Sequence, residues 1–196
     1  SGKFNTALGT SALYSNTSGN KNTASGYYAM RNNTSGLHNS AYGNESLKNN
    51  TTGRFNTASG SNSLASNTTG NLNTAIGYSV LKNNTTGAFN SALGVNALLA
   101  NTTGSSNTAL GTNSLRDNNS GSNNVALGYQ AGKSAKGSGN VFLGYKAGYK
   151  EIGSNKLYIA NDTSINLITG DFSTGDLSLG QTSGTVTILN DADIDG

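Results

Sequence analysis

Small and apolar residues recur along this chain at fixed places in a repeat of 17 residues. The repeat begins N-[TSV]-A-x-G and restarts without an insertion at Asn5, Asn22, Asn39, Asn56, Asn73, Asn90, Asn107 and Asn124. Counted from this Asn as position 1, position 3 is always Ala, position 5 is always Gly, and position 9 is Leu or Met in the first seven copies. A strict period this short indicates one solenoid turn per repeat, so we predict a rod whose core consists of these three columns.

The pattern within one repeat predicts two short strands joined by turns. In an extended segment alternate residues share a face, so positions 3 and 5 lie on one face and positions 2 and 4 on the other. Only Ala and Gly occupy the first face, which indicates a narrow space. We expect a second strand at the apolar pair of positions 8 and 9. The N-T-[TS]-G segment at positions 12 to 15 predicts a turn, because Asn and Gly tolerate left-handed backbone.

These elements predict an all-β fold, a parallel β-roll solenoid whose rungs lie about 4.8 Å apart. Ordering one residue costs about 1 to 2 kcal/mol of backbone entropy, while burying one large side chain returns only about 1.5 to 3 kcal/mol. A single thin coil is therefore poorly supported. Position 17 offers further apolar residues to bury, among them Phe4, Phe55, Leu72 and Phe89. We therefore expect side-by-side assembly of several chains.

The repeat changes after Asn124. The next starts are read at Asn140 and Asn155, so the rungs shorten to 16 and then 15 residues. Four alternating segments beyond them predict short strands between Gly, Asp and Asn turns. These segments are 155–161, 165–170, 177–180 and 185–189. We divide the chain into a start that reads as an expression remnant (1–3), the β-roll repeats (4–154) and a β-rich neck or connector (155–196).

Composition narrows the classes of function. The chain has one His and no Cys, which removes disulfides, thiolate metal sites and cysteine nucleophiles. Nine scattered acids and one His offer no paired carboxylates, nucleophile and base, or phosphate loop. We therefore predict that the protein is not an enzyme and uses no cofactor. No stretch approaches the roughly 20 apolar residues of a membrane span, so we predict no membrane insertion.

The net charge of +3 hides an uneven distribution. Residues 1–160 carry 12 Lys and Arg against 3 acids, whereas residues 161–196 carry 6 Asp and no Lys or Arg. A basic rod attracts acidic glycans or nucleic acid. We assign the basic residues to different repeat positions, without a stripe of basic and aromatic side chains, and therefore predict no nucleic-acid binding.

Three further motifs suggest a function but also have a structural explanation. Asp191, Asp193 and Asp195 match the opening of a D-x-D-x-D-G calcium loop, but the distal Glu of that loop is missing, so we predict an acidic tail and no metal site. His38 occupies the variable position 17 and is predicted to be a surface or interface residue. The N-T-[TS] motifs are formal glycosylation acceptors, but they recur in every turn and are predicted to be structural.

The rungs resemble a known family. Residues 124–128 (N-V-A-L-G) and 140–144 (N-V-F-L-G) are similar to the head repeat of trimeric autotransporter adhesins. The N-T-A-x-G…L…N-T-T-G form also resembles repeats in tail fibres of phages or contractile injection systems. The resemblance covers about residues 4–160. It implies a parallel β-roll in which three chains pack into one trunk, with a longer period than the family's usual rung and hence one enlarged loop.

We therefore predict a homotrimeric rod from an extracellular fibre, on a cell surface or a phage-like particle, that presents a surface for attachment to a host-cell glycan or protein or to matrix. The candidate ligand-binding residues depart from the repeat and are aromatic or Arg, because such side chains make adaptable contacts. They are Tyr27, Tyr28, Arg31, Arg54 and Tyr78. The alternative is a flat array of Thr and Asn columns that binds ice or a crystalline polysaccharide. Variable positions 6, 7, 10 and 11 argue against it because they roughen the surface.

Overall fold

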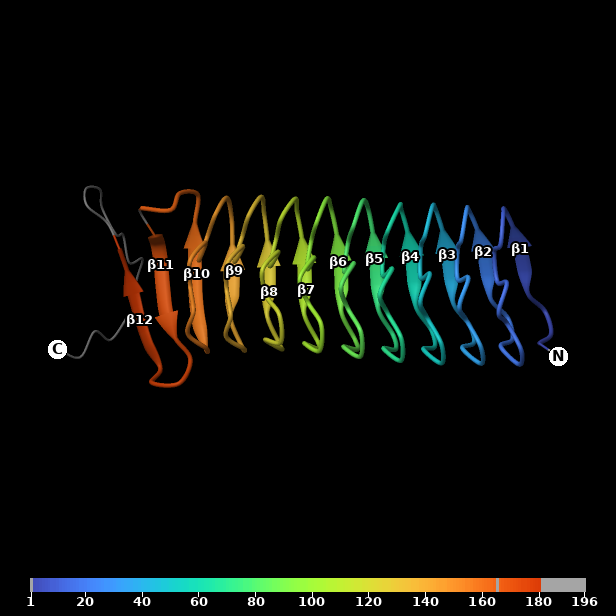
Figure 1. Ribbon diagram of the computed structural model, residues 1–196. Coiled ribbons are helices and arrows are strands. Elements are labelled where there is room, and N and C mark those ends of the chain that lie inside the picture. The colour runs from blue at the N-terminus through green and yellow to red at the C-terminus, as the bar shows by residue number, and fades with distance from the viewer. Residues whose placement is uncertain (1, 165, 181–196) are drawn as a thin grey trace, which may run out of the picture.

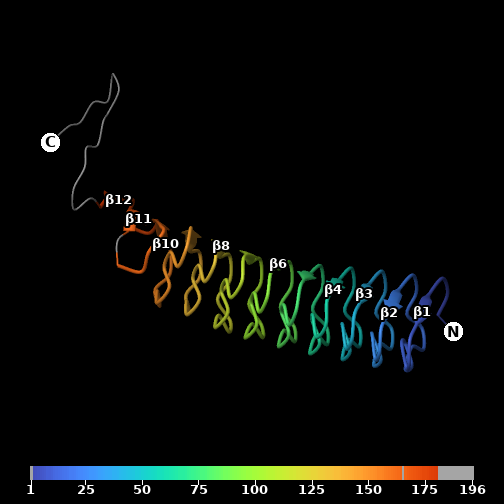
Figure 2. The ribbon, with the colours of Figure 1, turned by 90° about the horizontal axis from the view of Figure 1, so that it is seen from above.

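The structure, a computed structural model, describes residues 2–164 and 166–180. The chain forms an all-β parallel solenoid of about nine turns with rungs of about 17 residues, followed by antiparallel strands. Figure 1 shows the rungs stacked side by side from the N terminus to the C-terminal strands, and Figure 2 shows the strands along one side of the rod. The predicted solenoid is confirmed at this level.

One sheet runs the length of the described chain, and its strands are neighbours in chain order. Its strands are β1 (Thr6–Leu8), β2 (Thr23–Ser25), β3 (Ser40–Tyr42), β4 (Thr57–Ser59), β5 (Thr74–Ile76), β6 (Ser91–Leu93), β7 (Thr108–Leu110), β8 (Val125–Leu127), β9 (Val141–Leu143), β10 (Lys156–Ala160), β11 (Asn166–Asp171) and β12 (Asp176–Leu179). Strands β1 to β10 pair in parallel, while β11 and β12 add to β10 as an antiparallel meander. We number each rung after its strand, so rung 8 contains β8.

The register places each repeat position over the same position of the next rung. Ala58 of β4 pairs with Ala75 of β5, and this offset of one repeat holds as far as β8. At the C-terminal end of the solenoid, Phe142 at position 3 of rung 9 pairs with Tyr158 of β10. Tyr158 therefore takes position 3 and Lys156 position 1 of rung 10, so rung 9 has 16 residues. The predicted 15-residue rung from Asn140, with the next start at Asn155, is therefore wrong by one residue. Asn155 has the left-handed backbone (φ 61°) that is typical of position 17 in this chain.

The strands β10, β11 and β12 lie in three of the four segments predicted beyond the repeats. The fourth, 185–189, lies outside the described residues. The boundary placed at residue 155 stays a prediction. The sheet itself is continuous there, because β10 pairs with both β9 and β11.

The second strand predicted at positions 8 and 9 is wrong, because this side of the rung is built from turns. Positions 7 and 9 have left-handed backbone, as in Glu45 (φ 54°) and Leu47 (φ 49°), and the residues between them do not. The backbone N–H of Leu47 nevertheless donates to the carbonyl of Ser63 in the next rung at 3.0 Å, and that of Glu45 donates to Tyr27 in the preceding one at 2.8 Å. The ladder along the rod therefore continues without extended backbone.

Two of the three predicted core columns are buried. Position 3 (Ala58, Ala75) and position 9 (Leu64, Leu81) are fully buried. Position 5 Gly is needed for a different reason. A Cβ on Gly77, whose φ is +124°, would lie 2.2 Å from the carbonyl oxygen of Gly94 in the next rung. The backbones stack too closely there for any side chain.

Two columns of buried Asn complete the core. Within rung 4, the side-chain amides of Asn56 (position 1) and Asn67 (position 12) both donate to the carbonyl of Gly70, at 2.9 and 3.0 Å. Each Asn also bonds to its counterpart in the rung before: Asn67 donates to Oδ1 of Asn50 at 2.8 Å. A buried amide costs free energy unless it is hydrogen-bonded, and these ladders satisfy it. Sequence reasoning placed the second column only in a turn.

Rungs 8 and 9 keep the cross-section with different residues. Gly132 and Gly148 stand at position 9, where earlier rungs have Leu, and Phe142 stands at position 3, where they have Ala. Phe142 is fully buried. A Cβ on Gly132 or Gly148 would lie 2.4 or 2.1 Å from its ring. The large core side chain thus comes from position 3, in the strand, and not from position 9, in the turns.

Candidate functional site

The outer face of the sheet carries exposed apolar side chains that no described residue covers. Position 4 of each strand points outward, and from β5 to β8 it is apolar. Its residues Ile76, Leu93, Leu110 and Leu127 are 40%, 43%, 44% and 37% exposed. Position 2 adds an outward column of Thr, Ser and Val. We call these two columns over β5 to β8 the sheet face. A contiguous apolar surface on a soluble protein is typical of an interaction site.

A second apolar surface lies beside the turns of rungs 3 to 5. Phe55, Leu72 and Phe89 of position 17 line an open groove of about 640 Å³, together with Thr and Asn residues and Arg54. Phe55 stacks on His38 of the rung before, with ring centroids 5.0 Å apart. Because stacking runs along the rod, the rings cover each other's faces and present their edges to solvent. His38 is thus a surface residue, as expected, and lies one rung before the groove.

The five predicted ligand-binding residues lie in three places. Tyr27 and Tyr28 stack with centroids 3.8 Å apart, and Cζ of Arg31 lies 4.7 Å from the Tyr28 centroid. A hydrogen bond to Tyr28 raises the pKa of Tyr27. Arg54 lies in the groove beside position 17. Tyr78 is exposed at position 6 of rung 5, apart from the others.

The prediction that the basic residues are scattered among repeat positions is wrong in part, because one position holds five of the twelve. Five of them follow the first Asn of their copy by nine residues and thus share position 10. They are Arg31, Lys48, Lys82, Arg116 and Lys133. Tyr14 and Tyr149 occupy the same position at the two ends of the column. Assigning every charged residue its position in the repeat would have revealed this column in the sequence.

Some of this positive charge is neutralised locally. Nζ of Lys48 lies 3.0 Å from Oε1 of Glu45, and Nε of Arg116 lies 2.7 Å from Oδ1 of Asp117. Although partial burial opposes it, hydrogen bonds from Arg116 and Ser134 lower the pKa of Asp117. These exposed pairs contribute little to stability. The net charge of the column therefore rests on Arg31, Lys82 and Lys133.

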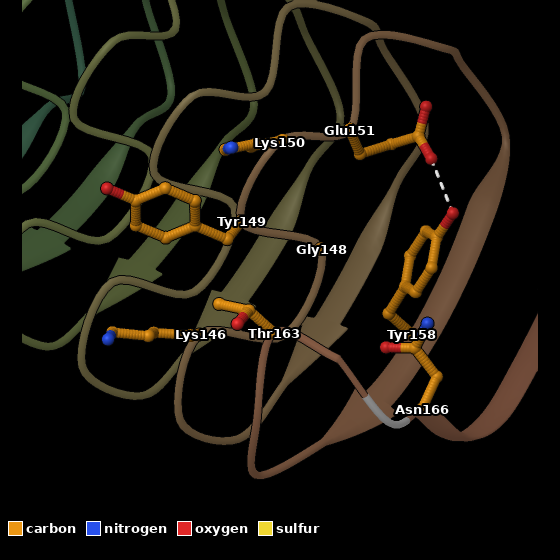
Figure 3. Close-up of a pocket in the computed structure, with 8 residues that line it drawn as sticks. All are labelled: Lys146, Gly148, Tyr149, Lys150, Glu151, Tyr158, Thr163 and Asn166. Carbon is orange, nitrogen blue, oxygen red and sulfur yellow. Dashed lines mark hydrogen bonds between the residues drawn. The ribbon is translucent and has the colours of Figure 1, made fainter.

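A pocket of about 640 Å³ lies where the solenoid meets the C-terminal strands (Figure 3). Its lining residues come from rung 9, β10 and the segment before β11: Lys146, Gly148, Tyr149, Lys150, Glu151, Tyr158, Thr163 and Asn166. The hydroxyl of Tyr158 donates to Oε2 of Glu151 at 2.5 Å, and the N–H of Gly153 donates to Oε1 at 2.5 Å. Burial and the Glu151 carboxylate raise the pKa of Tyr158 to about 12. Sequence reasoning did not single out this pocket.

The remaining predicted sites have the following outcomes. Asp191, Asp193 and Asp195 lie outside the described residues. Elsewhere, among residues 2–164 and 166–180, no three His, Cys, Asp or Glu side chains gather closely enough to hold a metal ion. The Asn of the N-T-[TS] motif is fully buried in rungs 2 to 6, as with Asn67, so it serves the core. The described part of the chain also contains no helix long and apolar enough to span a membrane.

A scan of protein-family models, a search of curated proteins and a search of solved structures each found nothing that matches this chain.

Proposed function

We propose that this chain is a structural and adhesive segment of an extracellular fibre. The observation that supports it best is the uniform cross-section, which the rod keeps from rung 1 to rung 9 by one continuous sheet and an Asn at position 1 of every rung, with a second Asn ladder at position 12 through rung 7. Such a solenoid grows in length without changing its surface, because each rung contacts only its neighbours. A rod of this kind is a spacer that carries variable side chains at fixed intervals.

We further propose that three copies pack side by side through the sheet face. The apolar position 4 residues of β5 to β8 form the centre of this interface, and the outward Thr and Ser of position 2 form its polar margin. Specific interfaces bury about 800 Å² on each partner, which requires several adjacent rungs. The homotrimer also accounts for a core too thin to support one chain. The resemblance to trimeric adhesin heads favours the same arrangement.

Sedimentation velocity tests the assembly. The wild type is expected to sediment as a trimer at micromolar concentration, and the double variant Leu93→Asp/Leu110→Asp is expected to sediment as a monomer. The matched control is Asn83→Asp/Thr86→Asp, which adds the same charge at exposed positions away from the sheet face. A wild type that is monomeric and melts cooperatively would contradict the trimer.

The proposed setting is a cell surface or a phage-like particle, and the proposed partner is a host-cell glycan or protein. The full-length gene distinguishes the two settings. An outer-membrane anchor beyond residue 196 indicates an autotransporter. A chaperone domain or neighbouring baseplate genes indicate a tail fibre.

The second candidate function is binding to ice or to a crystalline polysaccharide. The Asn columns cannot serve it, because their side chains lie inside the rod. The observation that favours it is the exposed Thr and Ser column at position 2, as in Thr57, Thr74 and Thr108, which repeats once per parallel strand. Thermal hysteresis of the wild type would support this function, and its absence would remove it.

A further inference from the structure

Positive charge is concentrated at the C-terminal end of the solenoid. Residues 124–150 carry four Lys and no Asp or Glu, whereas in residues 56–106 Lys82 is the only charged side chain. The acid that follows, Glu151, is engaged on both oxygens by Tyr158 and Gly153. The field over rungs 8 and 9 is therefore positive and poorly compensated.

The lysines there are interleaved with tyrosines. Nζ of Lys133 donates to the hydroxyl of Tyr149 at 2.8 Å, and both residues stand at position 10 of successive rungs. Nζ of Lys146 lies 4.9 Å from the centroid of Tyr145, which stacks on Tyr129 at 5.5 Å. Lys150 is exposed beside them.

Figure 3 shows Lys146, Tyr149 and Lys150 extending to one side of rung 9, away from the Glu151–Tyr158 pair. The hydrogen bond from Lys133, together with the charges of Lys146 and Arg116, lowers the pKa of Tyr149 despite some desolvation. A hydrogen bond with Tyr145 raises the pKa of Lys146, which keeps the amine charged. We call this cluster the basic edge; it consists of Lys133, Lys146, Tyr149 and Lys150.

We propose that the basic edge binds a linear acidic polysaccharide that runs parallel to the rod. The inference deepens the proposed function and rests on it for the kind of partner, a surface glycan. Rungs lie about 4.8 Å apart, and one pyranose unit is about as long as one rung is tall. Lys133 lies on rung 8, and Lys146 and Lys150 lie on rung 9, so two successive acidic sugars would each meet a lysine, and the tyrosines would contact the sugar rings. A nucleic-acid duplex fits less well, because the basic edge covers only two rungs, about 4.8 Å apart, whereas a duplex presents its phosphates across grooves about 6 to 12 Å wide.

Fluorescence anisotropy with labelled polygalacturonate, labelled heparin and labelled neutral dextran tests the proposal. The wild type is expected to bind one or both acidic polymers and not dextran, and more weakly as salt rises. The variant Lys133→Gln/Lys146→Gln/Lys150→Gln is expected to lose roughly tenfold in affinity, since three exposed ion pairs contribute about 0.5 kcal/mol each. The matched control Lys3→Gln/Lys21→Gln/Lys82→Gln removes the same charge elsewhere and is expected to change affinity less than about twofold.

The two acidic polymers distinguish carboxylate from sulfate as the recognised group. Equal losses in both triple variants would overturn the proposal, because binding would then follow net charge alone. Tighter binding to a labelled DNA duplex, lost in the first variant, would also overturn it. If the wild type sediments as a trimer but binds neither acidic polymer, the basic edge is refuted and the fibre proposal stands. Unchanged circular dichroism of the variants excludes misfolding as the cause.

Discussion

The regular rungs and the last rungs of this solenoid reach the same cross-section by different means. In rung 4 the core is filled by Leu64 at position 9, against Ala58 at position 3. In rung 9 the large side chain is Phe142 at position 3, opposite Gly148 at position 9. The Phe142 ring also fills the space beside Gly132 of rung 8, so adjacent rungs together keep the core filled without keeping the same residue at one position, as expected for a close-packed interior.

The polar core differs between the two regions as well. Position 12 is a hydrogen-bonded Asn through rung 7, then Ala135 in rung 8 and Glu151 in rung 9. Glu151 bonds instead to Tyr158, which takes position 3 of rung 10. The Asn ladder at position 12 thus ends in rung 7, before the chain turns to antiparallel strands, whereas the ladder at position 1 continues to Asn140. Each rung can change its core only together with the rungs on either side.

Removing the Phe142 ring is expected to give the largest effect. Phe142→Ala leaves a cavity between two glycines that have no side chain to fill it, which costs about 3 to 5 kcal/mol of unfolding free energy. Urea denaturation measures this loss. Tyr145→Ala, at an exposed position of the same rung, is the control and is expected to cost much less. Equal losses would contradict the volume argument.

The reciprocal change tests the comparison directly. Leu at position 9 normally has left-handed backbone, as in Leu98 (φ 51°), and Gly148 has φ 58°, so its backbone accepts Leu. Adding Gly148→Leu to Phe142→Ala is expected to restore roughly 1 to 2 kcal/mol of the loss. Gly148→Leu alone is expected to destabilise, because its Cβ would meet the Phe142 ring. A double variant less stable than Phe142→Ala would refute the exchange.

Breaking the Asn ladder is expected to have a smaller effect. Asn67→Ala removes the donors to Gly70 and to Asn50, which lie inside the rod. Leaving these acceptors short of a partner is expected to cost about 1 to 3 kcal/mol. Asn83→Ala, at an exposed Asn, is the control and should stay within about 0.5 kcal/mol of the wild type. Thermal denaturation of both variants measures the difference.

The smallest expected effect is the pH dependence of the Glu151–Tyr158 pair. Partial burial opposes the shift, but hydrogen bonds from Tyr158 and Gly153 outweigh it and lower the pKa of Glu151 in the folded protein. The contribution of Glu151 to folding stability is therefore present above about pH 4.5 and is lost as the pH falls through this lowered pKa. The pKa of Tyr158 is raised, so its contribution is complete below 10.0 and is lost as pH rises towards about 12. Partial solvent screening limits each to less than about 1 kcal/mol.

Glu151→Gln tests this pair. The variant is expected to flatten the acid limb of stability against pH and to lower the midpoint of tyrosinate absorbance at the alkaline end. Tyr145→Phe, a matched change at an exposed ring, controls for the other tyrosines. An acid limb that is unchanged in Glu151→Gln would show that other carboxylates determine it.

The candidate sites differ in whether the sequence revealed them. Tyr27, Tyr28 and Arg31 were predicted from their departure from the repeat, and the structure brings them into one cluster. The basic column at position 10 could have been found by counting repeat positions in the sequence, but it was missed. The pocket beside Tyr158 was not predictable, because it forms where the parallel sheet gives way to β11 and its shape depends on how the turns of rung 9 meet β10 and the start of β11.

The sequence by itself determined the period, the stacking direction and the Ala and Leu columns, because a solenoid repeats its local chemistry once per rung. Only the tertiary structure decided that positions 7 and 9 have left-handed backbone and that this side of the rung is built from turns and not from a strand. It also decided that the Asn side chains face inward. The reason is that both depend on hydrogen bonds to the next rung, such as Leu47 to Ser63 and Asn67 to Asn50, which one copy of the repeat cannot show.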